Sequence, residues 1–374
     1  MTPKLGRDDC DASRMLAPRE SSQEVQGASV AVVKAVVITK HGAPEVLAVE
    51  ERADPRVGPG EVRIAVEAAG INFADLMARS GVYPDAPDPP CVVGYEVAGT
   101  IESVGAGVDS HAVGDRVLAG TRFGGYAELV SVAAGQVIAL PDKLSFEQGA
   151  AFPVNYTTAW AALMIMGGLR SGDRALIHAA GGGVGIAATQ IAKQAGAEVF
   201  GTASPSKHDA IRAQGVDHAI DYRSQDFADE AMRITGGVGL DVIIDAVGPS
   251  SFKKDYKILR PGGRMIMYGL SEVQTGDKRD LPAVLRSLVT MPLATMPWWK
   301  SLQMMGENKG VFGLNMLSWW DDEGLDRLLD PLAEGLASGD YTPVVAEAFP
   351  FERASEAHRF IAERKNVGKV VLVP

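Results

Sequence analysis

The sequence predicts an α/β protein in which a doubly wound parallel sheet is joined to a mainly β module. Three observations favour this fold. From about residue 172 onward, short apolar strands alternate with helical segments, which is the pattern of βαβ units. Residues 31–153 instead contain β-rich runs bounded by glycine, proline and aspartate. The final segment, GKVVLVP, is a strand that we assign to the β module, which is therefore predicted to be discontinuous in sequence.

The predicted elements follow this division in order. The β-rich runs lie at 33–42, 60–71, 92–105, 114–120 and 124–132, with one helix at 72–81 that ends at Gly81. The parallel sheet is expected to use strands at 174–179, 198–203, 218–222, 240–248, 264–269 and 310–316. Helices are expected at 186–196, 205–215, 227–237, 252–263 and 325–339. The predicted domains are therefore 31–153 with 340–374, and 154–339.

The composition narrows the class of protein. A chain of 374 residues with 46% apolar and 22% charged residues is ordinary for a globular protein. The formal charge of −11 argues against general binding to nucleic acid. Two cysteines, Cys10 and Cys91, are too few for a disulfide framework and suit a reducing compartment, so we expect a cytoplasmic protein. No apolar run approaches the ~20 residues that span a bilayer.

Residues 1–30 form a polar N-terminal segment without the apolar stretch of a signal peptide. We predict that it is a mobile extension or an overlong start. A targeting role is the alternative.

A glycine-rich loop, LIHAAGGGVGIAATQ, follows a predicted strand and opens a predicted helix. Aligned on G-x-G-x-x-G, it places Ala180, Gly182 and Gly185 at the key positions, with Gly183 and Val184 between them. Such a loop lets backbone N–H groups approach a pyrophosphate at the start of a helix. The sequence therefore predicts a dinucleotide site, and the alternative is a glycine turn used only for packing.

The end of the second strand indicates which dinucleotide is bound. NAD sites carry an acidic residue there, whereas this chain has Thr202 and Ser204, followed by Lys207. Tyr222, with Arg223 beside it, ends the next strand. Hydroxyl and ammonium groups suit a 2′-phosphate, so we predict NADPH. The alternative for Lys207 is a solvated helix residue.

Several motifs over 31–374 resemble the medium-chain dehydrogenase/reductase superfamily and, within it, the zinc-independent quinone oxidoreductases. They are AAGINFADLMARSGVYP, GYEVAGTIESVG, VGDRV, GGYAE, HAAGGGVGIAATQIAK, DYRSQDF, LRPGGR and GKVVLVP. FGTASPSKHDAI, YGLSEVQTGDKRDL and KNVGKVVLVP are similar to the synaptic vesicle membrane protein, or vesicle amine transport, branch. This resemblance implies a GroES-like catalytic domain, a Rossmann NADPH-binding domain, a homodimer and, for that branch, peripheral membrane contact.

The resemblance also bears on metal binding. Zinc-bearing relatives have Gly-His-Glu where this chain has Gly94, Tyr95 and Glu96, and the segment 69–75 lacks their cysteine ligand. Zinc needs three or four N, S or O ligands, so we predict no metal. We expect Glu96 to be a buried structural group that is paired with a base such as Lys369.

The resemblance nominates three catalytic candidates, Asn72, Tyr83 and Tyr95. Asn72 would position the nicotinamide ribose or a substrate oxygen, or else would cap a helix. Tyr83 matches a tyrosine near the family's pocket, but Met77 replaces a second tyrosine that some relatives carry. Tyr95 would donate to the substrate or merely fill the vacated metal position.

The remaining candidates are cofactor contacts. Asn155 and Thr158 begin the helix between the domains and are placed to meet the nicotinamide, while plain helix capping is their alternative. Backbone that resembles the family's opposite cofactor wall surrounds Gly248, Gly269, Phe312 and Leu314. The side chains of Phe312, Leu314 and Met316 would form an apolar acceptor wall, for which a core strand is the alternative.

These inferences predict hydride transfer from NADPH to a quinone or an α,β-unsaturated carbonyl compound. A lipid-associated binding protein is an alternative that depends on Trp298, Trp299, Trp319 and Trp320 as membrane anchors. A dimer contact or a lid over the pocket is the other interpretation of these four residues. An enoyl-thioester reductase is the third possibility.

Overall fold

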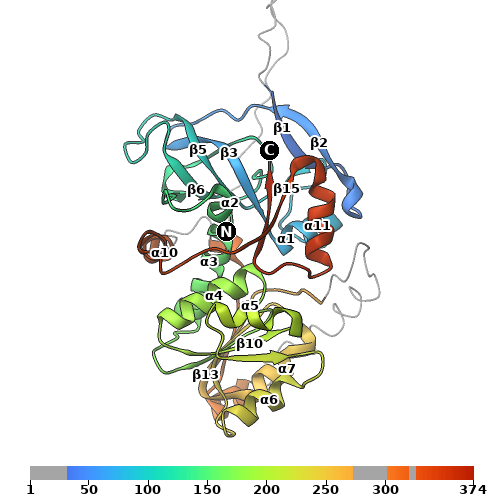
Figure 1. The fold of residues 1–374 in the computed structure, drawn as a ribbon, viewed down its shortest axis with the longest axis vertical. Coiled ribbons are helices and arrows are strands. Elements are labelled where there is room, and N and C mark those ends of the chain that lie inside the picture. The colour runs from blue at the N-terminus through green and yellow to red at the C-terminus, as the bar shows by residue number, and fades with distance from the viewer. Residues whose placement is uncertain (1–31, 273–300, 320–325) are drawn as a thin grey trace, which may run out of the picture. The chain divides into compact units, whose positions relative to one another are not determined.

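The computed structural model describes residues 32–272, 301–319 and 326–374, which Figure 1 shows in colour. Within it, Val32–Pro374 forms one compact unit. The predictions for residues 1–30 and for Trp298, Trp299 and Trp320 lie outside the described residues.

A six-stranded parallel sheet forms the lower part of Figure 1, with strand order β11-β10-β9-β12-β13-β14. Its strands are β9 (Arg174–Ile177), β10 (Glu198–Ala203), β11 (His218–Asp221), β12 (Leu240–Asp245), β13 (Leu259–Met267) and β14 (Gly310–Gly313). All neighbouring strands are parallel. The predicted doubly wound sheet is therefore confirmed, including its sixth strand.

Helices cover both faces of this sheet because its strand residues alternate between two apolar cores. Ala175 and Ile177 pack toward α3 and α4, whereas Leu176 packs toward α6 and α7. These helices are α3 (Pro153–Trp160), α4 (Gly183–Gln194), α6 (Phe227–Ile234) and α7 (Pro249–Ile258), and α5 (His208–Ala213) links β10 to β11.

The β module contains two sheets. The larger has the order β15-β16-β3-β5-β6-β8, with β7 also paired to β3, and the smaller has the order β2-β1-β4. Their strands are β1 (Val32–Ile38), β2 (Leu47–Ala53), β3 (Glu61–Ile71), β4 (Cys91–Val92), β5 (Glu96–Val104), β6 (Arg116–Gly120), β7 (Leu129–Ala133), β8 (Val137–Ala139), β15 (Val345–Pro350) and β16 (Lys369–Val373). β16 is antiparallel to β3, which confirms that the last strand returns to this module.

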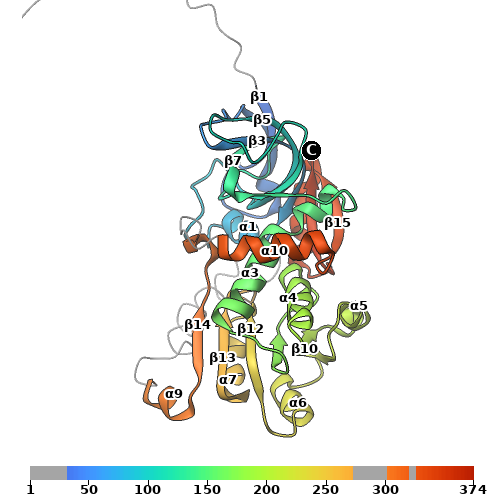
Figure 2. The ribbon, with the colours of Figure 1, turned by 90° about the vertical axis from the view of Figure 1, so that its left-hand side faces the viewer.

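The remaining helices belong to both modules. α1 (Phe73–Ser80) ends at Gly81 as predicted. α10 (Asp326–Ser338) packs against α3, and Figure 2 shows it crossing between the modules. The others are α2 (Phe146–Ala150), α9 (Ser301–Glu307) and α11 (Ala354–Ala362). No helix in the described ranges is long and apolar enough to cross a membrane.

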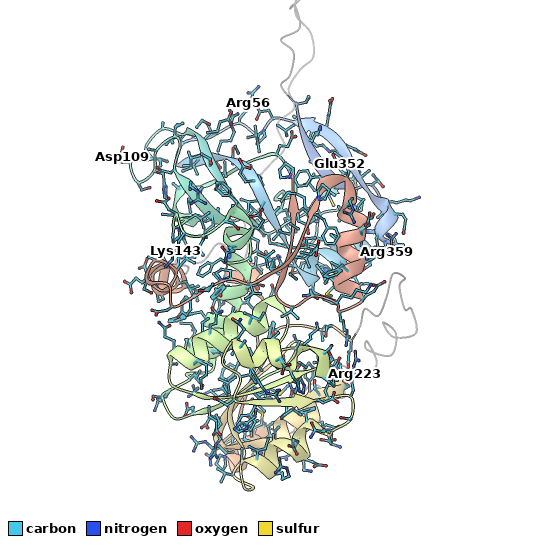
Figure 3. All side chains as sticks on the ribbon, in the orientation of Figure 1. Arg56, Asp109, Lys143, Arg223, Glu352 and Arg359 are labelled. Atoms are coloured by element: carbon cyan, nitrogen blue, oxygen red, sulfur yellow. The ribbon has the colours of Figure 1, made fainter. Side chains whose placement is uncertain are left out.

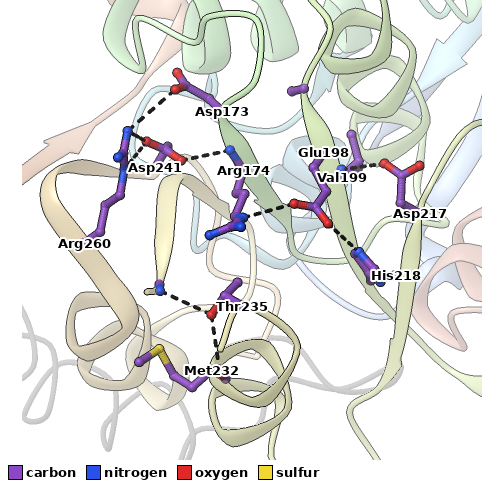
Figure 4. Close-up of polar contacts among 12 residues, drawn as sticks. Asp173, Arg174, Glu198, Val199, Asp217, His218, Met232, Thr235, Asp241 and Arg260 are labelled. Atoms are coloured by element: carbon purple, nitrogen blue, oxygen red, sulfur yellow. Dashed lines mark hydrogen bonds and ion pairs between the residues drawn. The ribbon is translucent and has the colours of Figure 1, made fainter. Parts of the chain in front are cut away.

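Ionic contacts join the amino ends of the parallel strands (Figure 4). Glu198 accepts from Arg174 Nε at 3.0 Å and contacts His218 Nε2 at 2.8 Å. Arg260 pairs with Asp241 on the neighbouring strand. These charges are partly exposed, so each pair adds on the order of 1 kcal/mol or less. The opposite, carboxyl ends of the strands are where ligands bind in such sheets.

Candidate cofactor and active site

The glycine loop connects β9 to α4 at the carboxyl edge of the parallel sheet. A Cβ on Gly185 would lie 2.4 Å from the carbonyl oxygen of Ala179, so only glycine allows this close turn. α4 begins at Gly183 and runs for 12 residues, and its first N–H groups have no partner within the helix. Its N-terminus is therefore suited to an anion such as a pyrophosphate.

Asn155 faces this loop from α3. Its side chain is 4% exposed and donates to the carbonyl oxygen of Ala151 at 2.8 Å. A Cβ on Gly183 would lie 2.5 Å from Asn155 Nδ2, so the two residues are in contact. Thr158 is also buried, while Thr157 makes the local bond to Pro153 O. The placement of Asn155 fits the expected cofactor contact, and the contact itself stays a prediction.

A group of cations gathers beyond the end of β10, where Ser204 is buried. The Lys207 ammonium donates to the carbonyl oxygen of Asn366 at 2.5 Å. Burial lowers the pKa of Lys207, and the nearby charges of Arg364 and Arg223 lower it further. Figure 3 labels Arg223 at this side of the parallel-sheet domain. Lys207 is therefore one of three clustered cations rather than an isolated, solvated helix residue.

Arg364 is the member of this group that sequence reasoning missed. It follows α11 and reaches the site from the β module, more than 150 positions along the chain from Lys207. No local motif marks it, because the contact depends on how the chain returns. Tyr222 is 41% exposed at the same edge, so its side chain is accessible to a ligand.

The predicted opposite wall has two parts. Gly248 has φ of 127°, a conformation that favours glycine, and a Cβ there would lie 3.0 Å from Glu272. A Cβ on Gly269 would lie 3.0 Å from Ala246, so this turn and the segment after β13 are closely packed. Phe312 on β14 is 40% exposed, whereas Leu314 lies in the core. The side chain of Leu314 is therefore a core residue, as the core-strand alternative predicted.

Glu96 lies at the centre of a buried cluster, hereafter the Glu96 cluster, formed with Asn72 and Lys369. Its carboxylate accepts from Asn72 Nδ2 at 2.9 Å and from the backbone N–H of Val154 at 2.7 Å, and pairs with the Lys369 ammonium. Lys369 also donates to Asn72 Oδ1 at 2.5 Å. This confirms the prediction that Glu96 is buried and paired with Lys369. It also binds both polar atoms of the Asn72 side chain into the cluster.

Asp75 holds two segments of the candidate site together. Its fully buried carboxylate accepts from the N–H of Asn72 at 2.7 Å and from the N–H of Gly94 at 3.1 Å. Burial raises the pKa of Asp75 to about 7, against the lowering effect of these hydrogen bonds and of Lys369. Asp75 is therefore a positioning group that titrates near neutral pH.

Tyr95 sits in an aromatic box that is formed by Tyr83 and Phe123. The ring centroids lie 6.4 Å from Tyr83 and 5.4 Å from Phe123. Tyr95 is 5% exposed, and its buried hydroxyl has no hydrogen-bond partner among the described residues. Burial raises the pKa of Tyr95 above its usual range. The hydroxyl is thus a protonated donor, and leaving it unpaired costs free energy.

Asn315 connects the two walls around this box. Its Nδ2 donates to Asp85 Oδ2 at 3.1 Å, and Asp85 follows Tyr83 by two residues. The segment after β14 therefore lies beside the loop that carries Tyr83. No local motif in the sequence indicates this contact.

The residues around Tyr95 do not fit a zinc ion. Both oxygens of Glu96 are already used by Asn72, Val154 and Lys369. In the described parts of the chain, no group of three His, Cys, Asp or Glu side chains with ligand atoms close together includes Tyr95 or Glu96 or surrounds them.

Comparisons with known proteins agree with this architecture. A family described as alcohol dehydrogenase GroES-like domain matches residues 58–142, and one described as zinc-binding dehydrogenase matches residues 214–372. The human synaptic vesicle membrane protein VAT-1 homolog is 38% identical over 354 residues, which cover 92% of this chain and 87% of that protein. The chain therefore belongs to the medium-chain dehydrogenase/reductase superfamily. Within it, the chain is similar to the VAT-1 homologues, as the sequence motifs predicted.

Two solved structures extend the comparison. Escherichia coli quinone oxidoreductase complexed with NADPH has a TM-score of 0.78 and 29% identity, over 91% of this chain and 100% of that chain. CurK enoyl reductase has a TM-score of 0.79 and 28% identity, over 91% of this chain and 99% of that chain. The protein is therefore an oxidoreductase by family, with quinone and enoyl reductases among its structural neighbours.

Proposed function

We propose that this protein is a zinc-independent, NADPH-dependent oxidoreductase that transfers hydride to a quinone or an α,β-unsaturated carbonyl compound. The observation that carries the proposal is the cation group Lys207, Arg223 and Arg364 beside Ser204. Three positive charges beside hydroxyl groups suit a 2′-phosphate, which NADPH has and NADH lacks. The NADPH complex of the quinone oxidoreductase neighbour supports the same choice.

The residues near Tyr95 supply what such a reaction needs from the protein. NADPH would supply the hydride, and the acceptor develops negative charge on an oxygen. The Tyr95 hydroxyl is a buried donor that has no partner among the described residues, so it is available to that oxygen. Tyr83 and Phe123 give an aromatic, apolar surround that suits a planar conjugated acceptor. Asn72 and Asp75 hold the surrounding backbone in place.

The cofactor preference gives the first test. NADPH and NADH oxidation should be measured with a panel of quinones and alkenals. Arg364→Gln should lower the NADPH-to-NADH ratio of kcat/KM about 10- to 100-fold, since one charge-assisted contact is lost. Arg353→Gln removes an exposed arginine of the same module and is the control. Equal kcat/KM for both cofactors in the wild type would contradict the proposal.

An enoyl-thioester reductase is the second candidate, and it is favoured by the similarity to CurK enoyl reductase. It uses the same cofactor and the same developing oxyanion. Turnover of acyl thioesters with a kcat/KM well above that of free alkenals would select it.

The lipid-associated alternative depends on four tryptophans, of which only Trp319 lies within the described residues. It is partly buried and packs against the main apolar core. The described side chain therefore supports packing rather than an interfacial anchor. Sedimentation with liposomes tests the peripheral contact that the VAT-1 resemblance implies.

We also propose a homodimer that uses β14. This strand is the edge of the parallel sheet, and it carries the exposed Phe312. An apolar sheet edge invites pairing with a second copy. Size-exclusion chromatography of Phe312→Glu beside the wild type tests this assembly.

A further inference from the structure

A buried ionisable group, hereafter the His178 cluster, lies at the carboxyl ends of the parallel strands. It consists of His178 after β9, Asp245 at the end of β12 and Asp255 on α7, and their polar atoms lie within 4.8 Å of one another. His178 is 2% exposed and both aspartates are 0% exposed. The reaction chemistry proposed above makes no use of these groups.

One side of the His178 cluster holds the glycine loop. His178 Nδ1 contacts Thr202 Oγ1 at 3.0 Å, and the same oxygen accepts from the N–H of Ala179 at 3.3 Å. Ala179 has φ of 52°, a left-handed conformation that is costly for a residue with a side chain. The contacts of His178 and Thr202 therefore brace a strained turn at the start of the loop.

The other side holds the turn at Gly248. The Asp245 carboxylate accepts from the N–H groups of Val247 and Gly248, the latter at 3.3 Å, and from the Ser251 hydroxyl. These bonds fix the turn between β12 and α7. The cluster thus connects the glycine loop to the turn at Gly248, two segments that the sequence predicts to contact the cofactor.

One carboxylate oxygen of Asp255 is buried without a described hydrogen-bond donor. Asp255 Oδ1 contacts His178 Nε2 at 2.9 Å, whereas the buried Oδ2 has no donor in the described parts of the chain. The nearby acidic group is Asp245, another acceptor. Two buried carboxylates without a donor between them repel strongly in a low-dielectric interior.

The surrounding elements supply no further cation to the described cluster. Tyr268, the residue after β13, lies near Asp245, and it is neutral because burial raises its pKa above the usual range. Phe227 of α6 packs its ring edge-on to His178, with centroids 4.7 Å apart. Lys254 of α7 pairs instead with Asp226 at 2.6 Å. His178 is thus one possible positive charge against two carboxylates.

We propose that Asp245 and Asp255 share one proton, and that this proton keeps the two cofactor turns in their binding geometry. The proposal rests on the proposed function, since it concerns the regulation of the same cofactor site. The shared proton supplies the donor that Asp255 Oδ2 lacks and removes one negative charge. Both aspartates act as positioning residues, because they touch the turns rather than the reacting atoms.

A dependence on pH follows. As the pH rises, the shared proton is lost, the carboxylates repel, and the turn at Gly248 shifts. NADPH affinity then falls. Asp255→Asn places a permanent N–H donor beside Asp245, so its affinity should not follow that titration.

The binding test compares three full-length proteins. The Kd for NADPH is measured by fluorescence from pH 6 to pH 9 for the wild type, Asp255→Asn and Asp229→Asn. Asp229 is an exposed acid of the same domain and controls for the loss of one charge. Over this pH range, the Kd for NADPH of the wild type and of Asp229→Asn should rise about three- to tenfold relative to that of Asp255→Asn. Parallel pH profiles of all three proteins would overturn the positioning role.

An infrared test examines the proton without the cofactor. The wild type minus Asp255→Asn difference spectrum at pH 6 should contain a protonated carboxyl band that disappears at high pH. Absence of that band, or a stoichiometric metal ion that Asp255→Asn releases, would overturn the shared proton. If the wild type fails to bind NADPH at every pH, the proposed function fails, while the infrared result still decides the proton.

Discussion

The Glu96 cluster and the His178 cluster are both buried, and both carry carboxylates, but their hydrogen-bond balance differs. In the first, both oxygens of Glu96 meet donors, and Lys369 supplies a full positive charge. In the second, Asp255 Oδ2 meets no described donor. A buried group whose donors and acceptors match is stabilised by its partners, whereas an unmatched one retains an uncompensated cost of desolvation.

The two clusters also connect different parts of the chain. The Glu96 cluster ties β5, β16 and the start of α1 to the first turn of α3, so it joins the β module to the helix beside the parallel sheet. The His178 cluster lies wholly within the parallel-sheet domain. Breaking each cluster should therefore affect different properties.

The largest expected effect comes from Lys369→Met. This change leaves the Glu96 carboxylate buried without its cation, so the free energy of unfolding should fall by about 3–5 kcal/mol. Urea denaturation monitored by fluorescence measures it. The double variant Glu96→Gln/Lys369→Met removes both charges and should recover most of the loss. A single variant as stable as the wild type would show that the pair contributes little.

The pH dependence of stability has two ranges, and the upper range belongs to His178. The pKa values of Asp75 and Asp245 are raised from 3.8 to about 7, mainly by burial, so their contribution is full below about pH 4 and is lost as the pH rises through 7. Burial lowers the pKa of His178, but the Asp255 carboxylate raises it from 6.5 to about 9. The contribution of His178 is therefore full below pH 6.5 and is lost as the pH rises through 9.

The loss of stability between pH 6.5 and pH 9 is therefore expected to come from His178. The wild type should lose about 2 kcal/mol of unfolding free energy between pH 6.5 and pH 9 beyond any loss in His178→Gln. Urea titrations at a series of pH values measure this difference. Equal slopes in the two proteins would remove His178 as the titrating group.

The smallest expected effect comes from Thr202→Val. It tests whether Thr202 holds the cofactor loop in its binding conformation or only adds to the stability of the fold. Thr202→Val removes the hydroxyl beside His178 and Ala179, and should cost about 1 kcal/mol together with a loss of NADPH affinity. The control residue, Thr235, lies between α6 and β12, away from the cofactor loop. Its hydroxyl donates to Met232 O and accepts from the N–H of Gly239 (Figure 4). Thr235→Val should cost a similar free energy of unfolding and leave the Kd unchanged. A Kd that changes equally in both variants would contradict the bracing role.

The fold was largely predictable because its signals are local. Alternating strands and helices, the glycine loop and the end of α1 at Gly81 each follow from residues close together in sequence. The pairing of Glu96 with Lys369 was also anticipated, since a buried carboxylate needs a nearby base. Arg364 and Asn315 were missed, because each reaches its partner across more than 150 positions of chain.

By itself, the sequence determined the family and the two kinds of sheet. Those properties depend on residue type and short spacing. The tertiary structure decided that the Tyr95 hydroxyl is buried without a described partner, that three cations gather beyond β10, and that His178 meets two aspartates. Burial and charge proximity arise only when distant segments pack together, and they decide which groups are protonated and which are free to bind a ligand.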